Sequence, residues 1–250
     1  MIDLRLGDCL AAEGLPSMPD RSVDVVLSDP PFDARTHRAA VELGPRIEGK
    51  RSVAGALPFA PLDANTLPTL ARHFARVARR WIVVFSGERQ IEAWAAALES
   101  AGARVVRVGL ALRTNPRPQM SGDRPAPPAD FLVIAYASPG RMSWNGGGKA
   151  GAWRSPPARF DTDGETVHPT QKPIALMREL VEDFTDPGEL VCDPFAGSGS
   201  TAIACKEMGR RFIGWEVSDA YHAVACARVL RAKEQLRLSA PKSSAGGGNG

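Results

Sequence analysis

Short runs of β-branched and aromatic residues alternate along the chain with segments in which apolar residues recur at helical spacing. The runs predict seven strands, at about residues 2–6, 23–28, 81–86, 104–112, 131–136, 189–193 and 211–215. The other segments predict helices at about residues 66–79, 88–101, 173–185, 200–208 and 219–236. Strands and helices that alternate in this way are typical of an α/β domain built on a parallel sheet.

Local signals place the ends of two of these helices. Gly102 follows the predicted helix at 88–101 and is expected to end it, while Ser218 is a suitable N-cap for the helix at 219–236. In that last helix, the apolar face is expected to include Val224, Ala227 and Leu230.

Three segments follow neither period, and loops of such length are usually functional or disordered. They are residues 33–65, 113–130 and 138–168. The glycine- and serine-rich residues 239–250 have the composition of a flexible tail, which leaves residues 1–238 as one domain.

Composition narrows the class of protein. The chain of 250 residues contains no apolar run as long as a membrane span, and its first residues lack the apolar core of a signal peptide. The four cysteines form no C-x-x-C pair, so reduced thiols in a cytoplasmic protein are expected. Residues 33–160 carry 19 Lys and Arg against 9 Asp and Glu, whereas both flanking segments are acidic. A basic middle of this kind favours contact with nucleic-acid phosphates.

The sharpest chemical signal is Asp29-Pro30-Pro31-Phe32, directly after the strand predicted at 23–28. Two prolines fix a rigid turn at the carboxyl end of a parallel strand, where α/β sheets place their ligands. The Asp29 carboxylate and the Pro30 carbonyl can both accept hydrogen bonds from one amino group, and Phe32 can stack on a flat base. An ordinary strand-ending turn is the alternative interpretation.

A glycine-rich turn, Asp193 to Thr201, joins the strand at 189–193 to a helix. Glycines let the backbone approach a ligand that faces the helix N-terminus. Glu216, which ends the next strand, is placed to bind ribose hydroxyls. The same spacing fits the dinucleotide-binding turn of a nicotinamide oxidoreductase, so this motif leaves both readings open. A third motif, His168 to Pro173, offers polar side chains just before a helix but by itself indicates only a helix start.

Taken together, D-P-P-F, H-P-T-Q-K-P and D-P-F-A-G-S-G-S-T resemble the permuted, beta-class amino-methyltransferases of DNA, of the N6-adenine and N4-cytosine type. The resemblance extends from about residue 2 to residue 232. It implies the Rossmann-like fold of S-adenosylmethionine-dependent methyltransferases, with a seven-stranded, mostly parallel sheet in the order 3-2-1-4-5-7-6 and one antiparallel strand. The chain would begin at the third spatial position, beside its own last strand at 211–215.

The resemblance also assigns residues to roles. Asp29, Pro30, Pro31 and Phe32 would form the catalytic turn. S-adenosylmethionine would be bound by Asp8, Cys9, His168, Thr170, Lys172, Asp193, Phe195, Ala196, Gly197, Ser198, Gly199 and Glu216. Within this set, Asp8 would accept a hydrogen bond from the adenine amino group and Glu216 from the ribose. Asp193 would lie near the methionine amino group, and Thr170 and Lys172 near the methionine carboxylate. The segment Arg113 to Pro118 resembles a family loop beside the target pocket.

The implied reaction is direct transfer of a methyl group to the exocyclic amine of a DNA base, with N6 of adenine as the preferred target. No Pro-Cys pair occurs, which disfavours cytosine-C5 methylation. Candidate DNA contacts are Arg35, His37, Arg38, Lys149 and Arg154. Trp144 precedes Lys149 and Trp153 directly precedes Arg154, and these tryptophans could equally anchor a loop to the core. No metal is expected, and the enzyme would be a monomer or homodimer in a bacterial or phage-infected cytoplasm.

Residues 138–167 stand where the family places its target-recognition region. An interval this short predicts a short or relaxed recognition sequence. N4-cytosine methylation, RNA methylation and a catalytically silent cofactor-dependent DNA-binding module stay open as alternatives, as does pairing with a restriction nuclease.

Overall fold

The computed structural model describes residues 1–31, 66–116, 123, 125–156 and 171–232. Its strands are β1 (Ile2–Leu6), β2 (Val25–Ser28), β3 (Trp81–Ser86), β4 (Arg104–Arg113), β5 (Ala129–Tyr136), β6 (Ala152–Ser155), β7 (Leu190–Asp193) and β8 (Arg211–Glu216). Its α-helices are α2 (Thr66–Val77), α3 (Ile91–Ser100), α4 (Ile174–Phe184), α5 (Ser200–Glu207) and α6 (Asp219–Arg231), and its 3-10 turns are η1 (Leu15–Ser17) and η2 (Glu88–Gln90).

All eight strands form one sheet in the order β1-β8-β7-β2-β3-β5-β4-β6. β5 runs antiparallel to both of its neighbours, and the other pairs of neighbours are parallel. The first seven strands of this order reproduce the expected 3-2-1-4-5-7-6 arrangement when counting begins at β7. The pairing of β1 with β8 is confirmed. Counted in this way β1 is strand 3, and it is the edge strand of the sheet and not the third strand from the edge.

The expectation of seven strands was wrong, because β6 adds an eighth beside β4. Leu110 pairs with Ala152 and Arg113 with Ser155 in a parallel register. β6 has only four residues and follows a glycine-rich stretch, so the sequence gives it too few positions for a period to emerge. Pairing with β4, some forty residues earlier in the chain, makes it a strand.

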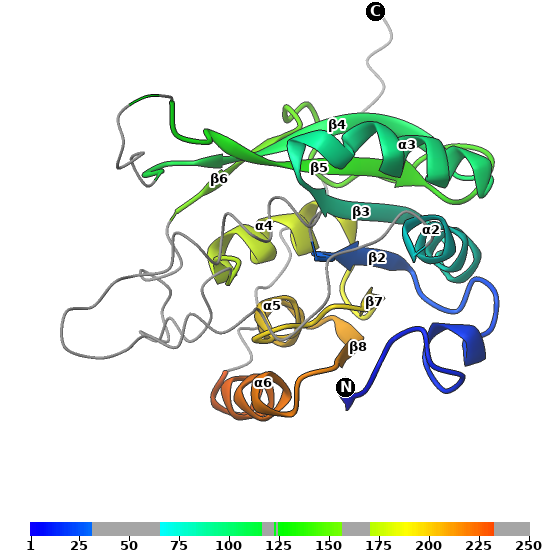
Figure 1. The fold of residues 1–250 in the computed structure, drawn as a ribbon, viewed down its shortest axis with the longest axis vertical. Coiled ribbons are helices and arrows are strands. Elements are labelled where there is room, and N and C mark those ends of the chain that lie inside the picture. Colours follow the sequence, from blue (N-terminus) through cyan, green and yellow to red (C-terminus); the bar gives the residue numbers. More distant parts are fainter. Residues whose placement is uncertain (32–65, 117–122, 124, 157–170, 233–250) are drawn as a thin grey trace, which may run out of the picture.

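Helices cover both faces of the sheet (Figure 1). The face that carries Leu27 and Phe85 packs against α4 and α5, and the opposite face, which carries Val26 and Val84, packs against α2 and α3. β2 and β3 are buried along their whole length, as expected for apolar runs at the centre of a parallel sheet. Within the described ranges, no helix has the length and apolar character needed to cross a membrane.

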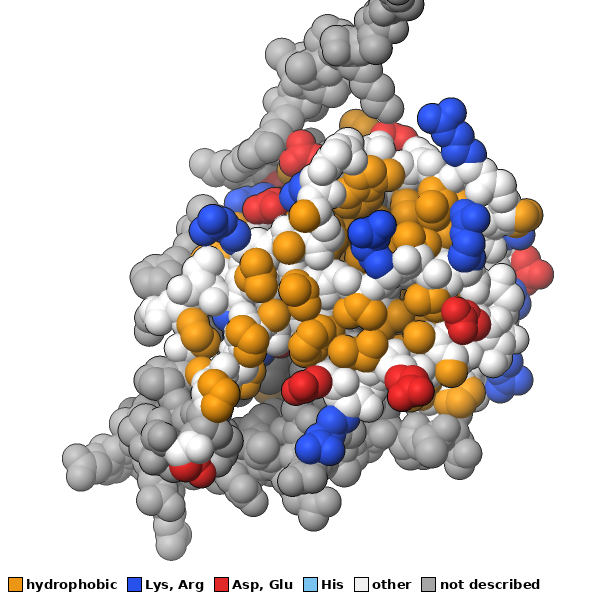
Figure 2. Space-filling model, turned by 90° about the horizontal axis from the view of Figure 1, so that it is seen from above, with side chains coloured by type: hydrophobic (Ala, Val, Ile, Leu, Met, Phe, Trp, Pro, Cys, Tyr) orange, Lys and Arg blue, Asp and Glu red, His pale blue; other side chains and the backbone are white. Residues whose placement is uncertain are grey.

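The β4 end of the sheet is less covered by helices. Val108 and Leu112 are exposed on β4, as are Arg104 and Arg107. Figure 2, which views the molecule from this end, shows hydrophobic side chains interspersed with charged side chains of both signs. The chain therefore presents a mixed apolar and charged surface here, whereas β2 and β3 are buried.

Helix ends follow the local signals more closely than helix faces do. Gly102 adopts a φ of +86° just beyond α3, and the Ser218 hydroxyl accepts a hydrogen bond from the Tyr221 amide at the start of α6. The predicted apolar face of that helix was wrong: Leu230 is 80% exposed, whereas Ala225 and Arg228 are buried. α6 also ends at Arg231 and not at residue 236. The predicted tail at 239–250 lies outside the described residues.

Candidate active site

The catalytic turn predicted from the sequence follows β2 directly. Ser28 ends the strand in the core, and Asp29, Pro30 and Pro31 continue the chain from the carboxyl end of β2, between β7 and β3. Asp29 therefore lies where the sequence predicts it, at the carboxyl end of a central strand. Phe32, Arg35, His37 and Arg38 lie outside the described residues.

The Asp29 carboxylate forms an ion pair with Lys172, whose Nζ donates to Asp29 Oδ2 at 2.5 Å. The same ammonium lies 4.8 Å from the centre of the Phe85 ring on β3. Burial raises the pKa of Asp29, and the positive charge of Lys172 works against that rise. Burial by itself lowers the pKa of Lys172, but the carboxylates of Asp29 and Asp130 outweigh it, so the lysine pKa is raised.

A second ion pair lies beside the first. Arg113, the last residue of β4, donates to Asp130 near the start of β5. The charges of both residues affect the pKa values of Asp29 and Lys172. The start of the loop expected beside the target pocket is thus close to Asp29, whereas residues 117–122 and 124 lie outside the described residues.

The glycine-rich turn is organised around the buried Asp193. Its Oδ1 accepts from the Phe195 amide at 3.1 Å and its Oδ2 from the Thr201 hydroxyl at 2.6 Å. Gly199 has a φ of +84°, and a Cβ there would lie 3.0 Å from the Ala225 Cβ of α6. Only glycine meets both constraints, so its presence at this position is explained by the turn itself.

Glu216 closes the turn from the carboxyl end of β8. Its Oε2 accepts from the Gly197 amide at 2.9 Å and its Oε1 from the Ser218 amide at 2.8 Å. The Gly7 amide also donates to the main-chain carbonyl of Glu216 at 2.9 Å, which places Asp8 at the same edge of the sheet. Asp8 and Glu216 therefore follow the carboxyl ends of two paired strands, β1 and β8, although they are far apart in sequence.

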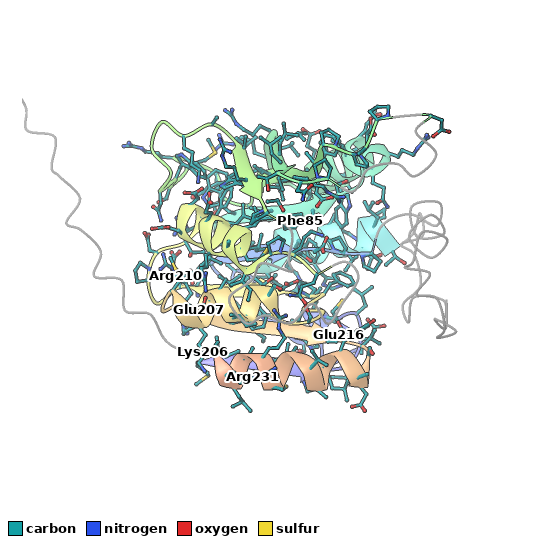
Figure 3. The ribbon with its side chains drawn as sticks, turned by 90° about the vertical axis from the view of Figure 1, so that its left-hand side faces the viewer. Phe85, Lys206, Glu207, Arg210, Glu216 and Arg231 are labelled. Carbon is teal, nitrogen blue, oxygen red and sulfur yellow. The ribbon has the colours of Figure 1, made fainter. Side chains whose placement is uncertain are left out.

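Figure 3 allows the carboxyl ends of the strands to be compared with their amino ends. Glu216, at the carboxyl end of β8, lies toward one side of this view, and Phe85, near the carboxyl end of β3, lies toward the same side. Arg210, which precedes β8, lies toward the other side. Glu216 and Phe85 therefore lie toward the edge formed by the carboxyl ends of the parallel strands.

Sequence reasoning missed one residue of this site, Arg228 on α6. Its side chain is 2% exposed, and Nη1 donates to the Ser198 carbonyl at 2.7 Å and to the Ser198 hydroxyl at 3.0 Å. A buried arginine of α6 thus stabilises the glycine-rich turn through two hydrogen bonds to Ser198. The signal available in the sequence was an arginine one helical turn after Ala225, on the face that the structure buries.

The sequence candidates at 149–154 take different positions. The Lys149 ammonium pairs with Asp183 at 2.7 Å and with Glu179 at 3.2 Å, so α4 already neutralises its charge. Trp153 is 1% exposed, and its Nε1 donates to Asp183 Oδ2 at 2.6 Å. Arg154 is exposed on β6. Both basic candidates in this segment are exposed, and they differ in that the Lys149 ammonium is paired with two carboxylates of α4.

The electrostatics of Asp193 lead to a prediction on stability. Burial raises its pKa to about 7, although the hydrogen bonds from Thr201 and Phe195 oppose the rise. Because the folded-state pKa lies above the unfolded-state value, the stabilising contribution of Asp193 is full below pH of about 4 and is lost as the pH rises through 7. Asp193→Asn keeps the shape without the charge. We expect the stability of the wild type relative to Asp193→Asn to fall by on the order of 4 kcal/mol over this window.

Urea unfolding of both proteins at several pH values between 4 and 9 measures this difference. Taking the difference between the two proteins removes the contribution of the other titrating groups. A difference that stays constant across the window would contradict the burial argument.

Among residues 1–31, 66–116, 123, 125–156 and 171–232, no three His, Cys, Asp or Glu side chains are placed to share a metal ion. The four cysteines are free thiols, and burial raises the pKa of Cys9 to about 12.

Comparison with known proteins places the chain in a family. The model of a DNA methylase family, N6_N4_Mtase, matches residues 23–227. The putative methylase YubD of Escherichia coli K12 is 28% identical over 248 residues, which cover 94% of this chain and 92% of that protein. The DNA adenine methyltransferase YhdJ of the same organism is 39% identical over 77 residues, but these cover only 31% of this chain and 26% of that protein.

Solved structures share the fold. The M1.HpyAVI–SAM complex superimposes with a TM-score of 0.69 at 24% identity, covering 92% of this chain and 99% of that one. The PvuII cytosine-N4-specific DNA methyltransferase superimposes with a TM-score of 0.68 at 15% identity, covering 91% and 86%. Since the family model spans most of the chain and the sheet order agrees with that expected from its motifs, the protein belongs to the N6_N4_Mtase family of DNA methylases.

Proposed function

We propose that this DNA methylase transfers a methyl group from S-adenosylmethionine to the exocyclic amine of a DNA base, with N6 of adenine as its target. The observation that carries the proposal is that Asp29 and the glycine-rich turn leave the carboxyl ends of two adjacent strands. β2 and β7 pair through Val25 with Val191 and through Val26 with Cys192. An amine held by Asp29 is thereby brought next to a ligand held by the turn.

The residues around the turn fit S-adenosylmethionine. Glu216 and Asp8 offer carboxylate oxygens that can accept from ribose hydroxyls and from an adenine amino group. The left-handed Gly197 and Gly199 bring the backbone close to a ligand, and Phe195 and Ala196 would line it. When bound, the cofactor supplies an electrophilic methyl group on a sulfonium sulfur. Cys9, Ser198, His168 and Thr170 stay in the proposed binding set, the last two from outside the described residues.

The role proposed for Asp29 follows from the chemistry of an aryl amine. The nitrogen lone pair is delocalised into the base, so the amine is a weak nucleophile. Hydrogen bonds from its two N–H groups to the Asp29 carboxylate and the Pro30 carbonyl localise that lone pair and orient it. The proton released from the methylated nitrogen passes to the Asp29 carboxylate and then to water. The attacking electron pair belongs to the amine, so no covalent enzyme intermediate is needed.

DNA binding is proposed for the basic residues near this edge. Arg154 is exposed on β6, and Arg35, His37 and Arg38 follow the catalytic turn outside the described residues. Phe32 would stack on the target base once it has left the duplex. Lys149 stays in this proposed set, with its ammonium also paired with Asp183 and Glu179.

Adenine is favoured over cytosine by the aspartate that opens D-P-P-F, as the resemblance to the family implies. The adenine methyltransferase YhdJ is among the relatives, and it supports the same choice. N4-cytosine methylation is the second candidate function, because the cytosine-N4-specific PvuII enzyme shares the fold.

Incubation with labelled S-adenosylmethionine and unmethylated DNA, followed by mass spectrometry of the nucleosides, tests the proposal. N6-methyladenine is the expected product, and it should be absent with Asp29→Ala. N4-methylcytosine would keep the mechanism and change the target base. Absence of any DNA methylation by the wild type would overturn the proposal and direct attention to RNA.

The recognition sequence is expected to be short or relaxed. The interval at 138–167 is short, and its described part contributes Trp144 and Trp153 to the core instead of presenting them to DNA. Methylome sequencing of a host that expresses the protein would measure this. A single long recognition sequence would contradict the prediction.

A further inference from the structure

Lys172 was expected near the methionine carboxylate of the cofactor, but the structure places its ammonium on Asp29. The two residues are 143 positions apart in the chain, and their side chains are 12% and 25% exposed. Lys172 leads into α4, whereas Asp29 follows β2. The contact therefore joins two motifs of the sequence, D-P-P-F and H-P-T-Q-K-P, through one ion pair.

We propose that Lys172 is a positioning residue of the catalytic carboxylate, which it holds through Oδ2 while Oδ1 serves as the acceptor for the substrate amine. The inference rests on the function proposed above, because it gives Asp29 the role of amine acceptor. It assigns the lysine to the target-base side of the site and not to the cofactor.

The geometry supports this assignment because two of the contacts of the ammonium join it to the centre of the sheet. One is Asp29 Oδ2, and the other is the face of the Phe85 ring, 4.8 Å away. Phe85 is fully buried on β3, which pairs with β2 through Ser28 and Val84. The aromatic face attracts the cation, and the rigid sheet fixes both partners relative to each other. A carboxylate held in this way loses less conformational entropy when it binds the amine.

The charge of Lys172 also favours the ionised form of Asp29. Among the described residues, Lys172 and Arg113 lower the pKa of Asp29, whereas Asp130 raises it. Burial acts in the same direction as Asp130 and raises this pKa. A protonated Asp29 would offer a hydroxyl hydrogen in place of a lone pair at one oxygen, and would hold the amine poorly. Lys172 is the cation in direct contact that opposes this outcome.

The two possible roles of Lys172 differ in what Lys172→Met changes. If the lysine positions Asp29, the variant should bind S-adenosylhomocysteine or S-adenosylmethionine within about threefold of the wild type, because its contact lies with the carboxylate. Its single-turnover methylation rate near neutral pH should fall at least about tenfold, which is less than the effect of about 10²–10⁴-fold for a group that itself transfers a proton. The acidic limb of its pH–rate profile should move to higher pH, since Asp29 then loses its cation. Lys172→Arg should restore the limb by keeping the charge.

A readout that does not need turnover separates this inference from the proposed function. The Asp29 carboxyl carbon can be followed by NMR titration of ¹³C-aspartate-labelled protein, with its signal identified by loss in Asp29→Asn. The titration midpoint should rise in Lys172→Met and not in Lys172→Arg. Lys206→Met is the matched control, because Lys206 donates to the Val229 carbonyl. In Figure 3, Lys206 lies toward the side of the molecule opposite to Glu216.

An unchanged Asp29 titration in Lys172→Met would overturn the inference. So would a tenfold or greater loss of cofactor affinity with an unchanged pH–rate profile, which would return the lysine to the methionine carboxylate. If the titration moves as expected but the wild type methylates no DNA, the Asp29–Lys172 coupling stands and the proposed function fails.

Discussion

Asp29→Ala is expected to lower the rate of methyl transfer by about 10³-fold, the size of effect seen when one preorganised polar group is removed from an active site. Without the carboxylate, the amine keeps only the Pro30 carbonyl as an acceptor, and its lone pair is neither localised nor oriented. Single-turnover measurements with saturating cofactor and DNA isolate this step from binding and product release.

Asp29→Asn provides the closest comparison, because it keeps the size of the side chain and removes the charge. It should be nearly as slow as the alanine variant, since an amide can turn a donor toward the amine. Binding of S-adenosylhomocysteine should be retained in both variants, because the cofactor is assigned to the glycine-rich turn and Glu216. Asp3→Asn, at an exposed pair with Arg5, serves as the control for a lost surface charge. Rates within about tenfold of the wild type for both Asp29 variants would remove Asp29 from the catalytic role.

Trp153→Ala is expected to destabilise the protein by about 3–5 kcal/mol, the usual cost of removing a large buried aromatic side chain. Trp153 is a buried residue of β6 that packs against α4, with its ring centre 5.8 Å from that of Phe184. Its loss also removes the Nε1 hydrogen bond to Asp183, a carboxylate that is only 7% exposed. Urea unfolding followed by far-ultraviolet circular dichroism measures the change without relying on tryptophan emission.

Trp153→Phe separates the two contributions. It keeps an aromatic ring in the core and removes the N–H donor, so it should cost about 1–3 kcal/mol. Asp183 would then keep Lys149 as its partner. If Trp153→Ala costs less than about 1 kcal/mol, β6 is not part of the folded core and this tryptophan is available for DNA.

The sequence alone determined the features that depend on neighbouring residues. Two prolines after a buried strand fix the turn at Asp29, and glycines with positive φ fix the turn between β7 and α5. The three motifs together carry the resemblance to the beta-class amino-methyltransferases, and that resemblance implied the order of the first seven strands. The pairing of β1 with β8 followed from that order.

The tertiary structure decided which partner each remaining side chain has. Whether Arg228 points to solvent or to the Ser198 carbonyl depends on how α6 docks, and the same docking leaves Leu230 exposed. α4 supplies the carboxylate of Asp183 to both Lys149 and Trp153, and no local pattern in the sequence predicts these two contacts.

The sequence also did not predict β6 or the contact between Lys172 and Asp29. A four-residue strand carries no readable period, and only its pairing with β4 defines it. Residues 143 positions apart give no local sign that they meet. The physical reason is common to all these cases: turns and strand ends are set by the backbone preferences of adjacent residues, whereas hydrogen bonds and ion pairs between side chains are set by packing.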